Sequence, residues 1–557
     1  DVATFQANGG LTTKPSTIFG KTGPNLKLTA GDDFIQQVRD YMSGKSPFLR
    51  GTFHMIGLAS EVIGSDPRTK GVVVLQLTFS VGDHCVARER IKTVADLKGK
   101  KIVLQKAGPH VGMLDDILKT AQLSWSDINV IWADDLTGSP ESPAEMFRSD
   151  SSIDACFVIS PDMLGLCGGL QSTGSGAEGS VKGSRVLVST AQLSKSIADV
   201  YVVRKDFYDA HRDLVTKFVA GYLKACEELV EFKKQYEAKG SPEYMKILAL
   251  AQQIYGDKVL PTLETDAHGL ISDCAFVGYP GNVAFFTEKG NLNGFEAFQK
   301  SALDLAVNLG FASVRAGLFP SGLDYSSADL MAGLKNVKVE RKGKFRAEAV
   351  QSEIEQLNSG AIDDKTIYSF AINFEPNQDE FSTVQYGAEF DRVVKMMSKY
   401  GNAVVAIRGH SDPTKVLVDL IKAGIKKGVI QQSGTKGNYQ YFFENNPLDL
   451  TATQKVAALI EAGAFDGVSE YNPRETMQAT LNLSKKRAEA VREAVIKYAA
   501  SNGLSVDKTQ IQPVGVGIRE PLIAKPKSVE EAGKNMRVEF RLIKVSAEAS
   551  APSDFEY

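Results

Sequence analysis

The stretch "KKIVLQKAGPHVGMLDDILKT", residues 100–120, places a strand candidate, a short loop and a helix candidate in direct succession. Its first six residues include the apolar run of a buried strand, and from Val111 the apolar residues recur at spacings of three and four. Gly108 and Pro109 interrupt both patterns and indicate the loop between them. Such a strand, loop and helix are the repeating unit of α/β domains with mostly parallel sheet.

The same alternation extends outward over about residues 20–335. Further strands are predicted at residues 25–30, 71–79, 128–133, 154–159, 185–190 and 198–204. Amphipathic helices are predicted at residues 32–42, 111–122 and 210–238. Residues 1–335 are therefore predicted to form an α/β domain.

Three junctions between a strand and the following loop carry polar residues. Ligands in open α/β sheets bind beyond the carboxyl ends of the strands, and a helix start favours anions. We therefore predict one pocket for a small solute, with an oxyanion such as phosphate as the expected class. Its candidate residues are Ser80, Gly82, Asp83, Lys106, Gly108, His110 and Ser160.

The composition excludes several other classes of protein. A chain of 557 residues with 43% hydrophobic and 24% charged residues is a multidomain globular protein. A net charge of -3 gives no general attraction to nucleic acid, and no apolar run reaches membrane-spanning length. The chain begins at Asp1, which we interpret as removal of an export signal, with simple trimming as the alternative.

Cysteine and histidine spacing gives no sign of metal or catalytic chemistry. The five cysteines contain no CxxC, so neither a zinc site nor a disulfide framework is expected, although one pair, nearest in sequence Cys156 and Cys167, could bridge. The histidines form no HExxH, and no GxSxG occurs. A cluster of His54, His84 and His110 with Cys85 has no ligand spacing. We predict no enzyme, metal or cofactor.

The second half of the chain has a different organisation. Residues 336–365 are charged and are predicted to be a linker. From residue 366 the predicted order is strand, helix, strand, a long excursion at 414–479 with amphipathic helices, then helix, strand and strand. This order predicts an α+β sandwich over residues 366–545 with a helical insertion, followed by a disordered tail at 546–557.

Two groups of opposite charge mark a candidate site in this half. The stretch "AVVAIRGHSDPTK", residues 403–415, reads as a strand that ends at Asp412, because Pro413 cannot donate to a ladder. Ser484 is interpreted as a helix N-cap, which places Lys485, Lys486 and Arg487 in the first turn. Cations are unfavourable there because the start of a helix carries partial positive charge. A ligand with a carboxylate would stabilise them.

Four motifs in order resemble the OmpA-like peptidoglycan-binding domain: "IRGHSD", "LSKKRAEAV", "GVG" and "NMRVEF". The resemblance implies a βαβαββ sandwich in which Asp412 and Arg487 bind the ammonium and carboxylate of diaminopimelate. Asn535 and Arg537 match the last motif, whereas Thr480 and Met536 stand where the family has asparagine and arginine. The excursion at 414–479 is also far longer than the connection in the family. It could gate the pocket, provide a surface for a partner, or have no function of its own.

The first half resembles the periplasmic substrate-binding proteins of nitrate, sulfonate and taurine ABC importers, through "IKTVADLKGKKIVLQ", "SIDACFVISPD" and "IADVYVVRKDF". The resemblance implies a type II-like fold of two α/β lobes, here about 1–95 with 200–335, and 96–199. It also implies closure on a solute and an ABC permease as partner. The family's first strand would precede residue 1.

Together these features predict an exported, non-enzymatic protein of the periplasm or cell envelope, which captures a solute and is tethered to peptidoglycan. The main alternative is a structural or adhesive envelope protein whose lobes serve as an interaction surface. A more distant alternative is an enzyme of the related thiamine-precursor type, which requires a cysteine-rich motif that the sequence lacks.

Overall fold

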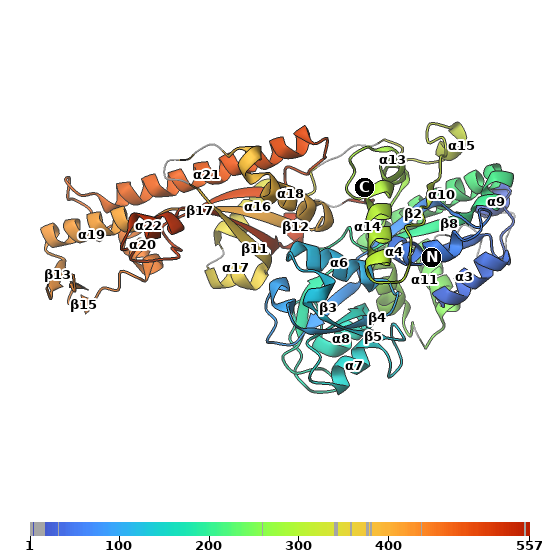
Figure 1. Ribbon diagram of the computed structural model, residues 1–557, viewed down its shortest axis with the longest axis horizontal. Coiled ribbons are helices and arrows are strands. Elements are labelled where there is room, and N and C mark those ends of the chain that lie inside the picture. Colours follow the sequence, from blue (N-terminus) through green and yellow to red (C-terminus); the bar gives the residue numbers. More distant parts are fainter. Residues whose placement is uncertain are drawn as a thin grey trace. The chain divides into compact units, whose positions relative to one another are not determined.

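The computed structural model describes residues 4, 17–29, 31, 33–258, 260–338, 343–356, 359–374, 378, 381–435, 437–550 and 553–556. The chain divides into two compact units. The first comprises residues 1–342 with 398–402 and 552–557, and the second comprises 343–397 and 403–551. In Figure 1 they run from blue to green and from yellow to red. Among the described residues no helix is long and apolar enough to span a membrane.

The first lobe of the first unit is built on a mainly antiparallel sheet in the order β1-β8-β2-β10, with β9 also paired to β2. β8 runs antiparallel to both β1 and β2, and only β10 is parallel to β2. The prediction of mostly parallel sheet is wrong here, because β2 leaves the lobe and the chain returns along it as β8. The bounds are β1 Phe48–Thr52, β2 Gly71–Ser80, β8 Ala198–Arg204, β9 Cys274–Phe276 and β10 Phe319–Pro320.

The second lobe has the sheet order β5-β4-β6-β3-β7. β4 pairs in parallel with β5 and β6, as the opening stretch predicts, whereas β3 is antiparallel to β6 and β7. Since β3 belongs to this sheet, the second lobe begins near residue 83 and not near 96. The bounds are β3 Asp83–Ala87, β4 Lys101–Gln105, β5 Asn129–Ala133, β6 Ala155–Ile159 and β7 Arg185–Ser189.

Helices cover both sheets of the first unit. α10 buries an apolar face against β2, with Phe218, Tyr222 and Val74 in one core cluster. The predicted strand at 25–30 is absent from residues 25–29, where Leu26 packs on this cluster, and residue 30 lies outside the described residues. The helices are α2 Ile18–Thr22, α3 Phe34–Ser43, α4 Phe53–Leu58, α5 Ser60–Ile63, α6 His110–Thr120, α7 Pro143–Ser149, α8 Ser160–Cys167, α9 Lys205–Ala210, α10 Arg212–Lys239, α11 Pro242–Tyr255, α12 His268–Ser272, α13 Tyr279–Thr287, α14 Phe295–Asn308 and α15 Ala328–Met331, with short turns η1 Val94–Leu97, η2 Trp125–Asp127 and η3 Leu263–Ala267.

The second unit has the predicted βαβαββ order, with an insertion that has its own core. Its sheet order is β11-β17-β12-β16, in which β12 and β16 are parallel and the other pairs antiparallel. The insertion packs Leu420, Ile430 and Ile460 together. The bounds are β11 Thr366–Asn373, α18 Thr383–Lys399, β12 Ala403–His410, α19 Thr414–Lys427, β13 Ile430–Ser433, β14 Gln440–Phe443, β15 Asn446–Pro447, α20 Thr453–Glu461, α21 Pro473–Ser501, β16 Ile511–Gly517, α22 Val529–Asn535 and β17 Arg537–Lys544.

Much of the predicted linker and tail is folded. Within residues 336–365 lie α16 (Ala347–Gln356) and α17 (Ser359–Lys365), and their residues Val350, Ile354 and Ile362 are buried against β12 and β16. The linker prediction rests on the many charged residues of this segment. Its apolar residues nevertheless form one helix face, which packs on the sheet of the second unit. In the tail, η4 (Ala547–Ala549) is ordered and Phe555 is buried, so a fully disordered tail is wrong for the described residues. Residues 339–342, 357–358, 551–552 and 557 lie outside them.

The helix predicted to begin at Ser484 begins eleven residues earlier in α21, at Pro473. Asn472 provides the cap by accepting from the Glu475 amide, with proline at the first position. Ser484 lies in mid-helix and its hydroxyl accepts from the Gly517 amide. The predicted N-cap is therefore wrong, and Arg487 does not lie in the first turn of a helix.

Close approach of α21 to the sheet explains the glycines of two motifs. A Cβ at Gly409 of β12 would overlap the main-chain carbonyl of Ser484, and one at Gly515 of β16 would lie 3.0 Å from the Leu481 carbonyl. Only glycine leaves room for a helix backbone at this distance. The "RGH" and "GVG" motifs therefore hold α21 against β12 and β16.

We expect Gly409→Ala to lower the free energy of unfolding of the second unit by about 3 kcal/mol, because backbone must move to admit the methyl group. Unfolding followed by circular dichroism measures this. Gly387→Ala is the matched control, since its Cβ would meet only Tyr498 at 3.8 Å. Both tryptophans, Trp125 and Trp132, lie in the first unit, so their fluorescence transition should not move. Equal stability of the two variants would contradict the close-approach argument.

Candidate functional site

The lobes of the first unit are joined by two crossing segments, residues 80–83 between β2 and β3, and residues 189–198 between β7 and β8. Main-chain bonds tie these segments to each other. The Ser80 amide donates to the Ile197 carbonyl at 3.0 Å, and the Thr190 amide donates to the Asp83 carbonyl at 2.9 Å. Residues on these segments are therefore fixed at the junction of the lobes.

Asp83 is the most constrained polar residue of this junction. Its side chain is buried, with one carboxylate oxygen 2.7 Å from His110 Nε2 and the other accepting from the Ser80 hydroxyl. Its amide donates to Thr190 Oγ1 at 2.9 Å. Burial by itself would raise the pKa of Asp83, but the bonds from His110 and Ser80 outweigh it and the pKa is lowered. The carboxylate is therefore held ionised.

Ser160, the first residue of α8, is surrounded by polar groups of both crossing regions. Its Oγ lies 3.1 Å from His84 Nε2 and donates to the Gly82 carbonyl at 3.2 Å. Asp273 joins them from the other lobe, because its carbonyl accepts from Val81 and its carboxyl group occupies the space a Gly82 side chain would need. Burial raises the pKa of Asp273 above its usual range.

Five predicted solute-site residues meet at this junction: Ser80, Gly82, Asp83, His110 and Ser160. Lys106 is exposed and its amide donates to the Ala133 carbonyl, and Gly108 packs on the Gln105 side chain. No described contact brings these two into the cluster. Sequence reasoning missed His84 as a site residue, although it adjoins Asp83, and Asp273, for which no local signal exists.

The imidazoles of His84 and His54 are neutral. Burial lowers the pKa of His84 to about 4 and that of His54 to about 3. The Nδ1 atom of His84 is buried and has no hydrogen-bond partner in the part of the chain that the structure describes. No carboxylate therefore orients His84 toward Ser160, and the pair lacks the third group of a nucleophile relay.

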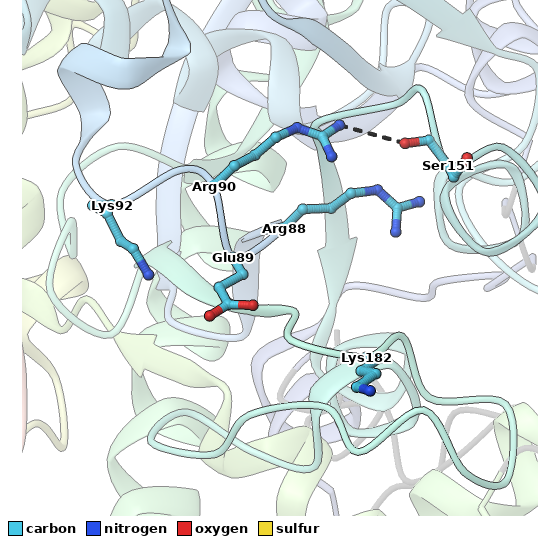
Figure 2. Close-up of a pocket in the computed structure, with 6 residues that line it drawn as sticks. All are labelled: Arg88, Glu89, Arg90, Lys92, Ser151 and Lys182. Carbon is cyan, nitrogen blue, oxygen red and sulfur yellow. Dashed lines mark hydrogen bonds between the residues drawn. The ribbon is translucent and has the colours of Figure 1, made fainter.

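A basic hollow of about 540 Å³ opens at the other end of β3 (Figure 2). Its lining residues are Arg88, Glu89, Arg90, Lys92, Ser151 and Lys182. Arg88 donates to the carbonyls of Phe147, Asp150 and Ile153, and Arg90 pairs with Asp154 at 2.6 Å. Both guanidinium groups therefore stabilise the loops after β3 and α7. None of the residues that line this hollow belongs to the polar cluster at the junction of the lobes.

In the second unit, Asp412 and Asn535, which belong to two different motifs, are hydrogen-bonded to each other. Asn535 Nδ2 donates to Asp412 Oδ2 at 2.8 Å, and the other carboxylate oxygen accepts from the Thr414 amide at 3.0 Å. Asn535 also bonds both main-chain groups of Ile523. Asp412 is partly exposed, at the point where β12 ends and the insertion begins.

Thr480 and Arg487 lie on the face of α21 that approaches this strand end. The Ser411 hydroxyl donates to the Thr480 carbonyl at 3.1 Å, which joins the helix to the residue before Asp412. Arg487 follows two turns later on the same face. It is buried, with its guanidinium 4.6 Å from the centre of the Phe374 ring.

Arg537 belongs instead to a largely buried network of charged side chains from β12, β17 and the residues after β16. Arg408 bridges Glu520 and Glu539 at 2.8 and 2.9 Å, His410 approaches Glu539, and Arg537 donates to the Glu520 carbonyl. Burial would raise the pKa of Glu539, but bonds from His410 and Arg541 lower it well below its usual range. His410, Glu520 and Glu539 lie close enough to hold a metal ion, but Arg408 already forms ion pairs with both carboxylates and Arg541 forms a second one with Glu539.

All five cysteines are free thiols, so Cys156 and Cys167 do not bridge. Four of them are buried, and burial raises the pKa of Cys85 to about 12 and that of Cys156 further. These thiols act as small apolar side chains.

One comparison with known protein families gives a match within the first unit. A family model described as NMT1/THI5 like matches residues 83–234, a stretch that includes Asp83, His110 and Ser160. This match supports the resemblance to substrate-binding proteins. Comparison with curated protein sequences finds no match.

Solved structures give similarities at low identity. The sulfonate-binding protein SsuA of Methylobacillus flagellatus KT is 18% identical, with 61% of this chain and 89% of that chain covered and a TM-score of 0.40. The aliphatic sulphonate binding protein SsuA of Escherichia coli is 17% identical, with 52% and 79% covered and a TM-score of 0.34. The desulfurization enzyme DSZB is 15% identical, with 48% and 79% covered and a TM-score of 0.29.

The neutral state of His84 predicts acid sensitivity of the first unit. The unfolded chain takes up a proton near pH 6.5, whereas folded His84 stays neutral to about pH 4, so stability falls as the pH drops through this window. We expect His84 to account for a loss of about 2 kcal/mol between pH 7 and pH 5. Urea unfolding followed by tryptophan fluorescence measures it, because Trp125 and Trp132 lie in the lobe that contains His84.

His84→Gln should flatten this pH dependence, since glutamine keeps a hydrogen-bonding group near Ser160 without titrating. His211→Gln, at an exposed histidine, is the control and should leave the slope unchanged. A slope equally steep in both variants would show that His84 is not held neutral.

Proposed function

We propose that this chain is an exported solute-binding protein of an ABC importer, which captures a small solute at the junction of its two lobes and binds peptidoglycan through its second unit. One observation carries the proposal. Polar side chains distant in sequence, Ser80, Asp83, His110, Ser160 and Asp273, converge where the chain crosses between the lobes. Two lobes joined by crossing segments can close on a ligand by rotation about them.

The charges of the junction bear on the class of solute. Asp273 places a carboxyl group beside Ser160, the Asp83 carboxylate lies in the same junction, and His84 adds no positive charge because its pKa is low. An ammonium or hydroxyl donor on the solute would suit these acceptors, and an oxyanion would require the main-chain amides at the start of α6 or α8. A zwitterion with an amine and a sulfonate would use both, so it is the solute class we favour.

The wall-binding role rests on the second unit. Asp412 is presented at a strand end, Asn535 fixes its carboxylate at 2.8 Å, and Arg487 lies on the helix face bonded to Ser411 through Thr480. A carboxylate for an ammonium and a guanidinium for a carboxylate form the pair that diaminopimelate requires. Holding the binding unit at the wall would raise the local concentration of captured solute.

One observation favours a structural envelope role instead. The carboxyl group of Asp273 already fills the space beside Gly82, and a hydrogen bond to Ser160 opposes the rise in pKa that burial causes. Polar groups that satisfy one another in this way would suit a junction that is permanently closed and used as an interaction surface.

The solute role is tested by thermal unfolding of the whole chain with taurine, butanesulfonate, phosphate or nitrate. A bound solute stabilises the folded state by mass action, so one probe at 100 times its Kd should contribute about 2.7 kcal/mol and raise the tryptophan-detected Tm. Ser160→Ala should abolish this shift, and Ser126→Ala, exposed in the same lobe, should retain it. No shift with any probe, together with no small molecule in native mass spectra, would favour the structural role.

The wall role is tested by sedimentation of the chain with diaminopimelate-containing peptidoglycan. We expect Asp412→Asn and Arg487→Lys each to reduce binding at least about tenfold, because each removes one charged or bidentate contact. Arg474→Ala, at an exposed arginine earlier on α21, is the matched control. Full binding by both site variants, with unchanged circular dichroism, would overturn the assignment.

A further inference from the structure

The last described residues of the chain, 553–556, belong to the first unit, although the second unit directly precedes them in the sequence. The Glu556 amide donates to the Phe276 carbonyl at 2.8 Å, so the segment extends from the end of β9. β9 itself pairs with the last residues of β2, directly before the first crossing segment. The tail therefore binds beside the junction of the lobes.

Phe555 packs into a space at the start of α13 that two glycines leave open. Its ring is 8% exposed and belongs to a core cluster that includes Phe276 and Tyr279. A Cβ at Gly278 would lie 2.9 Å from this ring, and one at Gly281 would lie 2.5 Å from the Glu556 carbonyl oxygen. Both glycines have negative φ, so their missing side chains, and not an unusual backbone, provide room for the tail.

Glu556 forms a buried ion pair with the second crossing segment. Its carboxylate lies 2.6 Å from Lys195 Nζ, and the two side chains are only 17% and 8% exposed. The ammonium group also lies 4.5 Å from the centre of the Phe79 ring, at the end of β2. A lysine buried to this extent is costly without an opposite charge, so Glu556 stabilises the position of Lys195. Asp554 adds an exposed pair with Lys234 at 2.8 Å.

We propose that the first unit has a second binding site, formed by Phe276, Gly278, Gly281 and Lys195, whose ligand is the acidic and aromatic segment 553–556 of this same chain. Glu556 reaches one crossing segment through Lys195, and its main chain reaches the other through β9 and β2. The lobes rotate about these two segments, so a tail that is bound to both of them restrains the hinge. This site does not depend on which solute, if any, the junction binds.

Hydrogen exchange of the whole chain, measured without solute, tests the restraint. Residues 190–197 should exchange at least about tenfold faster in Glu556→Gln and in Phe555→Ala than in the wild type, since opening no longer breaks the pair. Gly278→Ala should have the same effect by displacing the ring. Gly269→Ala is its matched control, because a Cβ there meets nothing within 4 Å. An unchanged tryptophan-detected unfolding transition distinguishes local release from global destabilisation.

A chain that ends at Ser550 tests the site itself. The synthetic peptide of residues 550–557 should bind this shortened chain and restore slow exchange of residues 190–197. A peptide with Phe555→Ala, or the shortened chain with Lys195→Met, should bind at least about tenfold more weakly. Asp554→Asn should change binding little, because its pair is exposed. Wild-type exchange in every variant, or equal binding of the altered and native peptides, would overturn the proposal.

Discussion

The buried carboxylate of Asp83 is the constraint on which the first unit depends. Removing a carboxylate from water costs several kcal/mol unless it is paired and hydrogen-bonded. Here the pairing joins elements that the sequence separates, since His110 begins α6, Ser80 ends β2, and Thr190 begins the return to the first lobe. One polar group thereby fixes the relative positions of the two crossing segments and one helix. The same arrangement places Ser160 and Asp273 within reach of each other.

Local patterns predicted most of the elements, because periodicity depends only on neighbouring residues. The strand and helix of residues 100–120, the strands β2, β6 and β8, and the order of the second sandwich all agree with the structure. The antiparallel return of β8 could not be predicted, since strand pairing is set by tertiary contacts. Asp273 and the pair of Glu556 with Lys195 join residues far apart in sequence, and no local signal marks them.

The position of Ser484 shows how a local signal can be misleading. A serine before three basic residues is a good cap, but Asn472 followed by Pro473 is an equally good one earlier in the chain. Packing decides between them, because the insertion core uses Met477 on the additional turns of α21. The position of Arg487 therefore depends on its burial beside Phe374, and not on a helix dipole. Met536, where the family has an arginine, immediately precedes Arg537 and the ionic network around Arg408.

The continuity of α21 has a mechanical consequence. A helix of 29 residues is about 44 Å long. Its first turns belong to the core of the insertion and its later turns are packed on β12 and β16, so the two parts are joined by a stiff rod. The other end of the insertion, α19, begins two residues after Asp412. A load applied to the insertion is thus delivered to both Asp412 and the helix that carries Arg487, which makes the relative position of these two side chains sensitive to tension.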